Sequence, residues 1–222
     1  MIDERLLSSQ PKIRASNIFY ISDLTKPCTR KAYFDIVNPQ EYPIKLLRIM
    51  ETGKILEKYW VRILKQCKNL RVLDMQVPAN FYAENFEIRG RIDVLAQHNN
   101  GELCLHEVKS IKSFNFLSQP RKDDSEQLQY YMNILGVEVG QIDYIDKSSL
   151  LNGGENNYSI DLSFKVYRDF NIFNDLVSRA NSLYHSINKR TIPKECKGWI
   201  CNYCQHRIEC EGTICSDELK EF

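Results

Sequence analysis

Two alternating apolar segments joined by a turn constrain the fold of this sequence more than any other feature. Residues 86–97 and 102–110 alternate apolar with polar side chains, and residues 97–101 read Gln-His-Asn-Asn-Gly. Such alternation predicts half-buried strands, and an Asn-Gly pair between two of them is typical of a tight hairpin. We therefore predict two antiparallel strands that lie side by side in a sheet.

Three charged side chains lie toward one end of this hairpin. Because side chains alternate along a strand, Glu107 and Lys109 share one face, and Asp93 reaches the same place from the neighbouring strand. Two carboxylates suit a hard cation such as Mg²⁺ or Mn²⁺, and an ammonium can contact the water or phosphate that the cation holds. The pattern alone is more typical of solvated strand charges. The apolar neighbours of all three residues favour a phosphodiesterase site, because they place the charges at the ends of buried strands.

Length and charge place the chain among ordinary globular proteins. With 222 residues it can bury a core, and we expect one domain over residues 1–222. A charged start and the lack of an apolar run near ~18 residues predict a cytoplasmic protein without a membrane segment. The net charge of +1 gives no overall attraction to nucleic acid, so DNA binding must come from local basic patches.

The number and spacing of the cysteines indicate a bound metal or cluster. The chain has eight, and in a reducing compartment closely spaced thiols indicate a metal or cluster. Three of them form a C-x2-C-x5-C pattern: Cys201, Cys204 and Cys210. Structural zinc would take its fourth thiolate from Cys196 or Cys215, whereas a 4Fe-4S cluster would take it from a remote residue such as Cys28. The spacing fits both equally.

The longest helical pattern covers residues 44–68. One face is apolar or small at a period of 3.6 residues: Ile49, Gly53, Leu56, Trp60, Ile63, Leu64 and Cys67. The segment has seven basic and two acidic residues. A ridge of Lys54, Lys58 and Arg62 is ordinarily a solvated helix face, but a phosphate backbone could use it. Glu57 lies at the margin of the apolar face, where its carboxylate can point inward.

The other elements do not alternate as strict βαβ units. We predict further strands at 70–82, 141–146 and 157–167, helices at 123–136 and 169–189, and short helical segments capped by Ser22 or with Pro27 in the first turn. Gln127 and Tyr131 are four residues apart and share a helix face. This mixture indicates an α/β fold, a mixed sheet flanked by helices.

Two segments have no clear periodicity. Residues 1–15 read as a loosely held lead-in. Residues 111–122 interleave basic side chains with two phenylalanines, so this loop either contacts phosphates and bases or packs its aromatic rings on the core.

Taken in order, the motifs resemble one nuclease family. They are a lone cysteine followed by Arg30 and Tyr33, then Gly53-Lys54-Ile55-Leu56-Glu57, Gly90-Arg91-Ile92-Asp93, Glu107-Val108-Lys109 and Gln127-x3-Tyr131, and finally C-x2-C-x5-C. Over about residues 16–212 this order resembles the RecB-like nucleases of the PD-(D/E)xK superfamily in their iron-sulfur form. It is most similar to the small CRISPR-associated exonucleases, the fourth family of Cas proteins.

The resemblance implies a restriction-endonuclease-like core with a cysteine-rich appendage, formed by the segment around residue 28 and by residues 196–215. It implies a Mg²⁺- or Mn²⁺-dependent exonuclease that acts on single-stranded DNA ends or overhangs during CRISPR spacer acquisition. Other adaptation proteins would be its partners, and the oligomeric state stays open.

Site residues follow position by position from the same resemblance. Asp93, Glu107 and the Val108 carbonyl would hold the metal, and Lys109 would orient the attacking water. The supporting motif is Gln127 and Tyr131. The cluster ligands would be Cys28, Cys201, Cys204 and Cys210, which leaves Cys67, Cys104, Cys196 and Cys215 as structural thiols.

One position departs from the family pattern. The family has a histidine as a further metal ligand on the helix after the glycine, and this sequence has Glu57 there. A glutamate still suits Mg²⁺ or Mn²⁺, although it changes the charge of the site. A second hypothesis, from another class of function, is a DNA-end-binding scaffold subunit of an adaptation complex with weak or no nuclease activity. A zinc-stapled protein-binding module is a third, but it leaves the acidic and lysine motifs unexplained.

Overall fold

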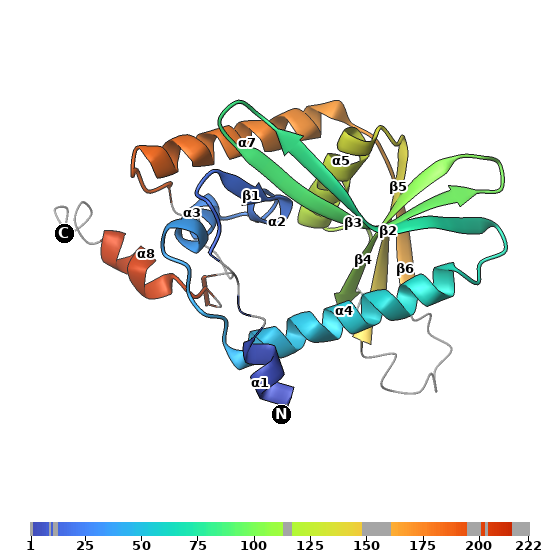
Figure 1. The fold of residues 1–222 in the computed structure, drawn as a ribbon, viewed down its shortest axis with the longest axis horizontal. Helices are drawn as coiled ribbons and strands as arrows, with labels where there is room; N and C mark the ends of the chain where they lie inside the picture. The colour runs from blue at the N-terminus through green and yellow to red at the C-terminus, as the bar shows by residue number, and fades with distance from the viewer. Residues whose placement is uncertain are drawn as a thin grey trace.

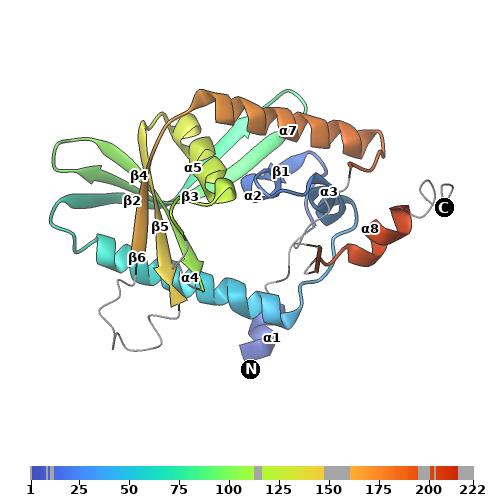
Figure 2. The same ribbon diagram turned by 180° about the vertical axis from the view of Figure 1, so that it is seen from behind.

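A mixed β-sheet with helices on both faces organises the structure, a computed structural model (Figure 1). The described residues are 2–8, 10, 13–112, 117–147, 161–194, 201–202 and 204–214. Helix α4 (Ile44–Leu64) crosses one face of the sheet. Helices α5 (Lys122–Leu135) and α7 (Phe170–Asn188) cover the other face, as the reverse view also shows (Figure 2). The α/β fold class predicted from the sequence is confirmed.

Within the described residues the sheet has six strands: β1 (Ile18–Tyr20), β2 (Leu70–Tyr82), β3 (Glu87–His98), β4 (Leu103–Ile111), β5 (Val139–Asp146) and β6 (Asp161–Tyr167). Their order is β1-β3-β4-β5-β6, and β2 pairs with the other edge of β3. Strands β3 and β4 form the predicted hairpin, which turns at Gly101 with a φ of 87°. Strands β4 and β5 run parallel, and α5 provides the crossover that a parallel pair requires.

Two strands, β1 and β4, pair with different parts of the same edge of β3. Strand β1 pairs with residues 87–89 of β3, and β4 pairs with residues 94–97. Residues 90–93 therefore lie between two ladders, and β3 and β4 separate from each other just where Asp93 and Glu107 are placed. The backbone N–H of Val108, just past the end of the β3–β4 ladder, donates to Asp93 Oδ2 at 2.8 Å.

Two apolar layers hold the helices on the sheet. Beneath α4, Trp60, Val61 and Leu64 pack against strand residues that include Val94 and Val108. The larger layer lies between the sheet and helices α5 and α7, and its fully buried members include Leu128, Tyr130, Met132, Ile142 and Leu176. Burial of this kind provides the main favourable free energy of folding.

Only part of α4 follows the predicted apolar face. Ile49 is 50% exposed, because the first turns of α4 extend past the sheet toward α1 (Ile2–Leu7) (Figure 1). Cys67 is exposed as well, because the helix ends at Leu64. The prediction that both side chains face the core was wrong.

Several local predictions near the N-terminus were also wrong. Helix α1 lies where we expected a loose lead-in. Helix α2 (Ile21–Leu24) is capped at Tyr20, whose N–H donates to Asp23 Oδ2 at 2.8 Å, so Ser22 lies inside the helix. Helix α3 (Thr29–Val37) begins after Cys28 as its N-cap, which puts Pro27 just outside the first turn.

The C-terminal helix α8 (Arg207–Ile214) was not predicted at all. Cys196, Cys215, the phenylalanines of the predicted loop and the start of the strand predicted at 157–167 lie outside the described residues.

Gly90 and Gly53, from two of the sequence motifs, provide a matched test of this packing. A Cβ at Gly90 would lie 2.5 Å from the Tyr131 ring, whereas the nearest atom at Gly53 is Ser110 Oγ at 3.8 Å. Gly90→Ala should lower the free energy of unfolding by about 1–3 kcal/mol through overpacking. Gly53→Ala, inside a helix, should raise it by about 0.5–1 kcal/mol. Urea unfolding followed by circular dichroism measures both, and changes of the same sign would contradict this packing.

Candidate functional site

Lys109 lies at the centre of the predicted site. Its Nζ is 2.7 Å from Glu107 Oε1 and donates to Gln127 Oε1 at 2.8 Å. Gln127 Nε2 in turn donates to the Tyr131 hydroxyl at 2.8 Å. The structure therefore brings the strand motif and the helix motif together in one chain of contacts. Asp124, which the sequence analysis did not single out, adds a carboxylate oxygen 3.5 Å from Lys109 Nζ.

Asp93 and Glu57 share one hydrogen-bond donor, the side-chain amide of Gln76. Asp93 Oδ2 accepts from the Val108 N–H, and Asp93 Oδ1 accepts from Gln76 Nε2 at 3.1 Å. The same Gln76 amide nitrogen donates to Glu57 Oε1. Glu57 thus points from α4 toward Asp93, as its place on the helix suggested, and Gln76 joins the two carboxylates.

The Glu107 carboxylate is only partly satisfied. Its side chain is 4% exposed, and Oε1 bonds to Lys109. The other oxygen, Oε2, is buried and has no hydrogen-bond partner among the described residues. A buried carboxylate oxygen without a partner is costly, and a cation or an ordered water is the usual way to satisfy it.

Burial raises the pKa of the acids of the site, and the charge of Asp93 adds to the shift of Glu57 and Glu107. Burial, followed by the charge of Asp93, raises the pKa of Glu107 to about 8 and that of Glu57 to about 7. Burial also raises the pKa of Asp93. For Lys109, burial acts to lower the pKa, but Glu107 and Asp124 outweigh it and the net shift is upward. Lys109 therefore stays an ammonium and can donate hydrogen bonds but not act as a base.

The carboxylates of this site and the Val108 carbonyl are oxygen ligands of the kind that bind a divalent cation. Carboxylates and the Val108 carbonyl are the ligands that Mg²⁺ and Mn²⁺ prefer, and a cation would relieve the repulsion that raises the carboxylate pKa values. Within the described ranges, however, no three His, Cys, Asp or Glu side chains already converge as a closed metal site. Gln76 stands between Glu57 and Asp93, and Lys109 holds one oxygen of Glu107.

The cysteine motifs meet at the start of α3. Burial raises the pKa of the Cys204 thiol most, and the nearby Cys28 adds to the shift. Cys204 N–H donates to the Cys201 carbonyl at 3.2 Å, and Arg30 Nη1 donates to Cys210 Sγ at 3.5 Å. The four predicted cluster ligands thus lie on two segments in contact. Both alternative zinc ligands fall outside the described residues.

His206 fixes the C-terminal segment on α3, and no sequence pattern indicated it. The ring is 1% exposed, with Nε2 2.8 Å from Asp35 Oδ1 and Nδ1 2.7 Å from Glu209 Oε2. It stacks on Phe34 at a centroid distance of 5.6 Å. Burial acts to lower the pKa of His206, but the two carboxylates outweigh it and raise it. Because each ring nitrogen of His206 faces a carboxylate, the protonated imidazolium form is favoured.

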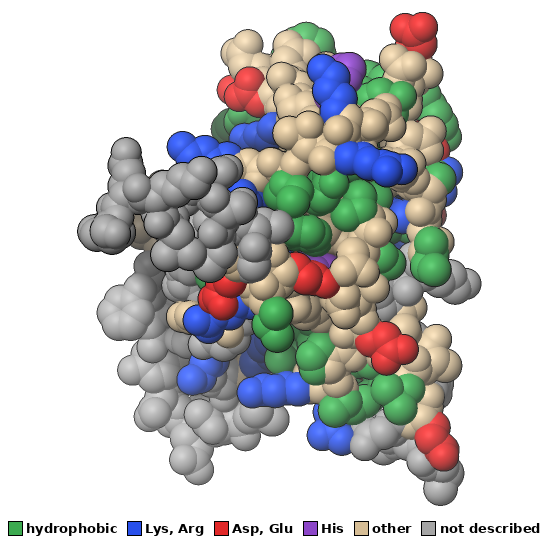
Figure 3. Space-filling view, turned by 90° about the vertical axis from the view of Figure 1, so that its left-hand side faces the viewer, with side chains coloured by type: hydrophobic (Ala, Val, Ile, Leu, Met, Phe, Trp, Pro, Cys, Tyr) green, Lys and Arg blue, Asp and Glu red, His purple; other side chains and the backbone are tan. Residues whose placement is uncertain are grey.

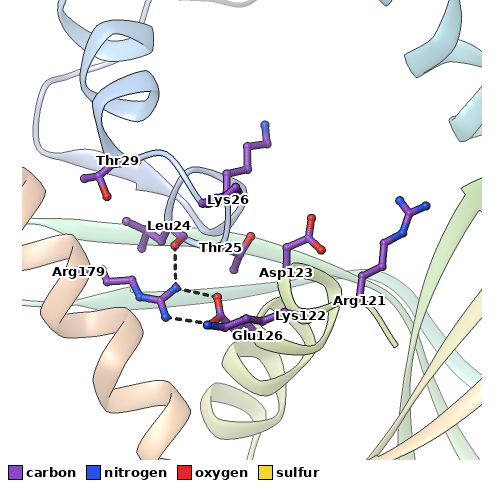
Figure 4. Close-up of a pocket in the computed structure, with 10 residues that line it drawn as sticks. Leu24, Thr25, Lys26, Thr29, Arg121, Lys122, Asp123, Glu126 and Arg179 are labelled. Atoms are coloured by element: carbon purple, nitrogen blue, oxygen red, sulfur yellow. Dashed lines mark hydrogen bonds and ion pairs between the residues drawn. The ribbon is translucent and has the colours of Figure 1, made fainter. Parts of the chain in front are cut away.

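A cavity of about 840 Å³ opens beside the N-terminus of α5 (Figure 4). Its basic lining residues are Lys26, Arg121, Lys122 and Arg179. Arg179 is held by a two-pronged ion pair with Glu126, whereas Lys26 and Arg121 extend to the open side (Figure 4). A second groove of about 510 Å³ adjoins Gln127 and Tyr131 and is lined by Arg89 and Arg91.

These grooves localise positive charge that the sequence as a whole lacks. The face that carries α8 shows lysine and arginine side chains dispersed among acidic and apolar ones (Figure 3). In contrast, Gln127 and Tyr131 themselves line the second groove, and the cavity beside α5 is lined by residues at the start of the same helix, including the acidic Asp123 and Glu126. Basic side chains in such grooves can attract a phosphate backbone.

Solved structures of other proteins share the fold that surrounds this site. A protein named SSO0001 matches with a TM-score of 0.65 and 20% identity over 95% of this chain and 92% of its own. LHK-Exo, an alkaline exonuclease from Laribacter hongkongensis, matches with a TM-score of 0.55 and 13% identity over 84% of this chain and 93% of its own.

This chain shares its fold with an alkaline exonuclease. A second structure of LHK-Exo, in complex with dAMP, matches with a TM-score of 0.54 and 14% identity over 78% of this chain and 88% of its own. Neither the family models nor the curated protein sequences give a match. Among the described helices, none has the length and apolar character to cross a membrane.

The raised pKa of Glu57 gives a test of the site's electrostatics. The folded protein holds a proton on Glu57 up to a pH of about 7, whereas the unfolded chain releases it near the ordinary value of 4.5. The charge therefore destabilises the fold fully above pH 7 and not below pH 4.5. Glu57→Gln removes the charge and should raise the melting temperature in EDTA at pH 8.5, by about 2–4 °C per 1 kcal/mol relieved.

At pH 4.5 the same substitution should change the melting temperature little. Glu51→Gln is the matched control, because Glu51 lies on the same helix with a side chain that is 44% exposed. An equal effect of Glu57→Gln at both pH values would mean that its charge is not the cause.

Proposed function

We propose that this chain is a divalent-metal-dependent nuclease that hydrolyses phosphodiester bonds in DNA. One observation carries the proposal: Glu107 Oε2, a buried carboxylate oxygen that has no hydrogen-bond partner among the residues that the structure describes, lies on the same side chain that pairs with the protonated Lys109. The fold shared with LHK-Exo supports the same function.

The proposed roles follow from the contacts of each side chain. Asp93, Glu107 and the Val108 carbonyl would hold Mg²⁺ or Mn²⁺, and Glu57 would take the place of the family's histidine. A cation there stabilises the charge that develops on the phosphate during hydrolysis. Lys109 donates to the attacking water or to a phosphate oxygen, and the upward shift of its pKa keeps it charged for this task.

Gln127 and Tyr131 would act on Lys109 rather than on the phosphate. Gln127 accepts from Lys109 Nζ and donates to the Tyr131 hydroxyl, so it fixes the direction of the ammonium. Tyr131 is buried at 1% exposure and packs against Gly90, which anchors this chain of contacts on the sheet. A positioning chain of this kind limits the motion of the donor.

The substrate we propose is a DNA end or single-stranded overhang. The groove lined by Arg89, Arg91, Gln127 and Tyr131 would give a path for a phosphate backbone, and the basic residues of the cavity beside α5 would extend it. The solved complex of LHK-Exo with dAMP supports a nucleotide ligand in this fold. The motif order that resembles the CRISPR-associated exonucleases supports cleavage during spacer acquisition in the cytoplasm, beside other adaptation proteins.

We also propose a 4Fe-4S cluster held by Cys28, Cys201, Cys204 and Cys210. The segment that carries the last three docks on α3 at the N-cap, Cys28, and His206 and Arg30 hold the two segments together. Four thiolates there suit such a cluster, which would join the two ends of the nuclease region.

Substitution of the proposed catalytic residues should separate cleavage from binding. Asp93→Asn, Glu107→Gln and Lys109→Met should each lower the rate of cleavage of an end-labelled single-stranded DNA with Mn²⁺ by about 10²-fold or more. The losses should not add in double variants, because the residues act as one unit. Fluorescence anisotropy should show DNA binding within a few-fold of the wild type.

Lys65→Met and Asp74→Asn are matched controls, because both side chains are exposed. Full activity in Asp93→Asn would contradict the proposed site. A wild-type protein that binds overhangs but cuts none of them with Mn²⁺ or Mg²⁺ would support the scaffold function instead.

Loss of one proposed cluster ligand should be visible directly. Cys28→Ser, purified without oxygen, should lose the visible absorbance of thiolate-ligated iron and part of its thermal stability. Cys67→Ser should keep both, because Cys67 is exposed at the end of α4 and far from α3 in the sequence. A colourless wild-type protein that holds one zinc ion would contradict the cluster.

A further inference from the structure

Gln76 has an unusual backbone in an otherwise regular strand. Its φ is 55°, and among the described residues Arg190, with a φ of 53°, is the other non-glycine residue with a positive value. Arg190 follows the C-cap of α7, where left-handed residues are common. Gln76 instead lies inside β2, where this conformation costs about 1 kcal/mol or more. Such a cost persists only where the surrounding structure determines the conformation.

The pairing of β2 with β3 shows which residue lies opposite Gln76. Met75 pairs with Val94 and Val77 pairs with Ile92, so Gln76 stands opposite Asp93. The left-handed turn carries the Gln76 side chain to the Asp93 and Glu57 carboxylates, and its amide nitrogen donates to both. The distorted residue is therefore the one that lies between two of the three proposed metal-binding carboxylates.

The amide can serve a cation as well as a carboxylate. A half-turn about the last side-chain bond exchanges Nε2 for Oε1, and a carboxamide oxygen is a regular ligand of hard divalent cations. It adds an oxygen without adding a negative charge. This matters here because the Asp93 carboxylate already repels those of Glu57 and Glu107.

We propose that Gln76 is a fourth side chain of the cation site. Without a cation its amide nitrogen holds Glu57 and Asp93 together, and after the half-turn its amide oxygen binds Mg²⁺ or Mn²⁺. The inference rests on the proposed function. It adds a ligand that no motif in the sequence indicates, and it gives a reason for the left-handed backbone in the middle of β2.

The experiment measures Mn²⁺ affinity in the full-length protein by electron paramagnetic resonance of free Mn²⁺, with melting in EDTA as a check of folding. Gln76→Met keeps the length of the side chain and removes both amide groups, so the dissociation constant should rise by about 10-fold or more. Gln76→Glu keeps the oxygen, so its dissociation constant should stay within about 3-fold of the wild type or fall. Its melting temperature in EDTA should fall, because a further carboxylate joins the repelling set.

Gln97→Met is the matched control, because Gln97 lies in the neighbouring strand and its amide donates to the Gly101 carbonyl within the hairpin turn. It should bind Mn²⁺ like the wild type. A purely structural donor role predicts the opposite order of the two Gln76 variants, with Gln76→Glu weaker than Gln76→Met, and that order would overturn the proposal.

The remaining outcomes distinguish the proposed role of Gln76 from the proposed nuclease function. Unchanged Mn²⁺ affinity in Gln76→Met overturns this inference and leaves the proposed function in place. Should Gln76→Met not fold, Gln76→Glu decides alone, and a loss of about 10-fold or more in its affinity overturns the inference. No Mn²⁺ binding by the wild type overturns the proposed function and this inference with it.

Discussion

The hydrogen bond between the Val108 N–H and Asp93 Oδ2 is the contact on which the site depends most. Strands β3 and β4 pair only up to Val94 and His106, after which β3 continues toward β1 and β4 continues beside β5. The separation leaves backbone groups without a ladder partner, and the Asp93 carboxylate satisfies one of them. This bond holds Asp93 against Val108, the residue after Glu107, so the proposed metal site would lie at the fork in the sheet.

The charges at this fork oppose folding unless something binds them. Glu107 is 3% exposed and Lys109 supplies one of its contacts, while Glu57 and Asp93 share the Gln76 amide. Burial raises the pKa of each acid, which means that the ionised site costs stability in the protein alone. Residues that cost stability in a fold are common at functional sites, since the same repulsion becomes favourable interaction with a cation.

The sequence was enough to predict the features that depend on local periodicity. Alternation along β4 placed Glu107 beside Lys109, a four-residue spacing placed Gln127 beside Tyr131, and the Asn-Gly turn fixed the hairpin. It could not predict Gln76, because a left-handed residue inside a strand has no signature in residue type. It also missed His206, whose carboxylate partner Asp35 lies far away in the chain. Contacts of this kind arise only when the tertiary fold brings distant segments together.

A crystal structure of the protein grown with Mn²⁺ and recorded at a wavelength where manganese scatters anomalously tests the proposed metal site most directly. We expect one strong anomalous peak within coordination distance, about 2.0–2.3 Å, of oxygens from Asp93, Glu107 and the Val108 carbonyl. We also expect Lys109 to keep its contact with Gln127. A peak located elsewhere, or none at this fork in crystals that contain Mn²⁺ at a concentration that supports DNA cleavage, would contradict a metal site at the fork.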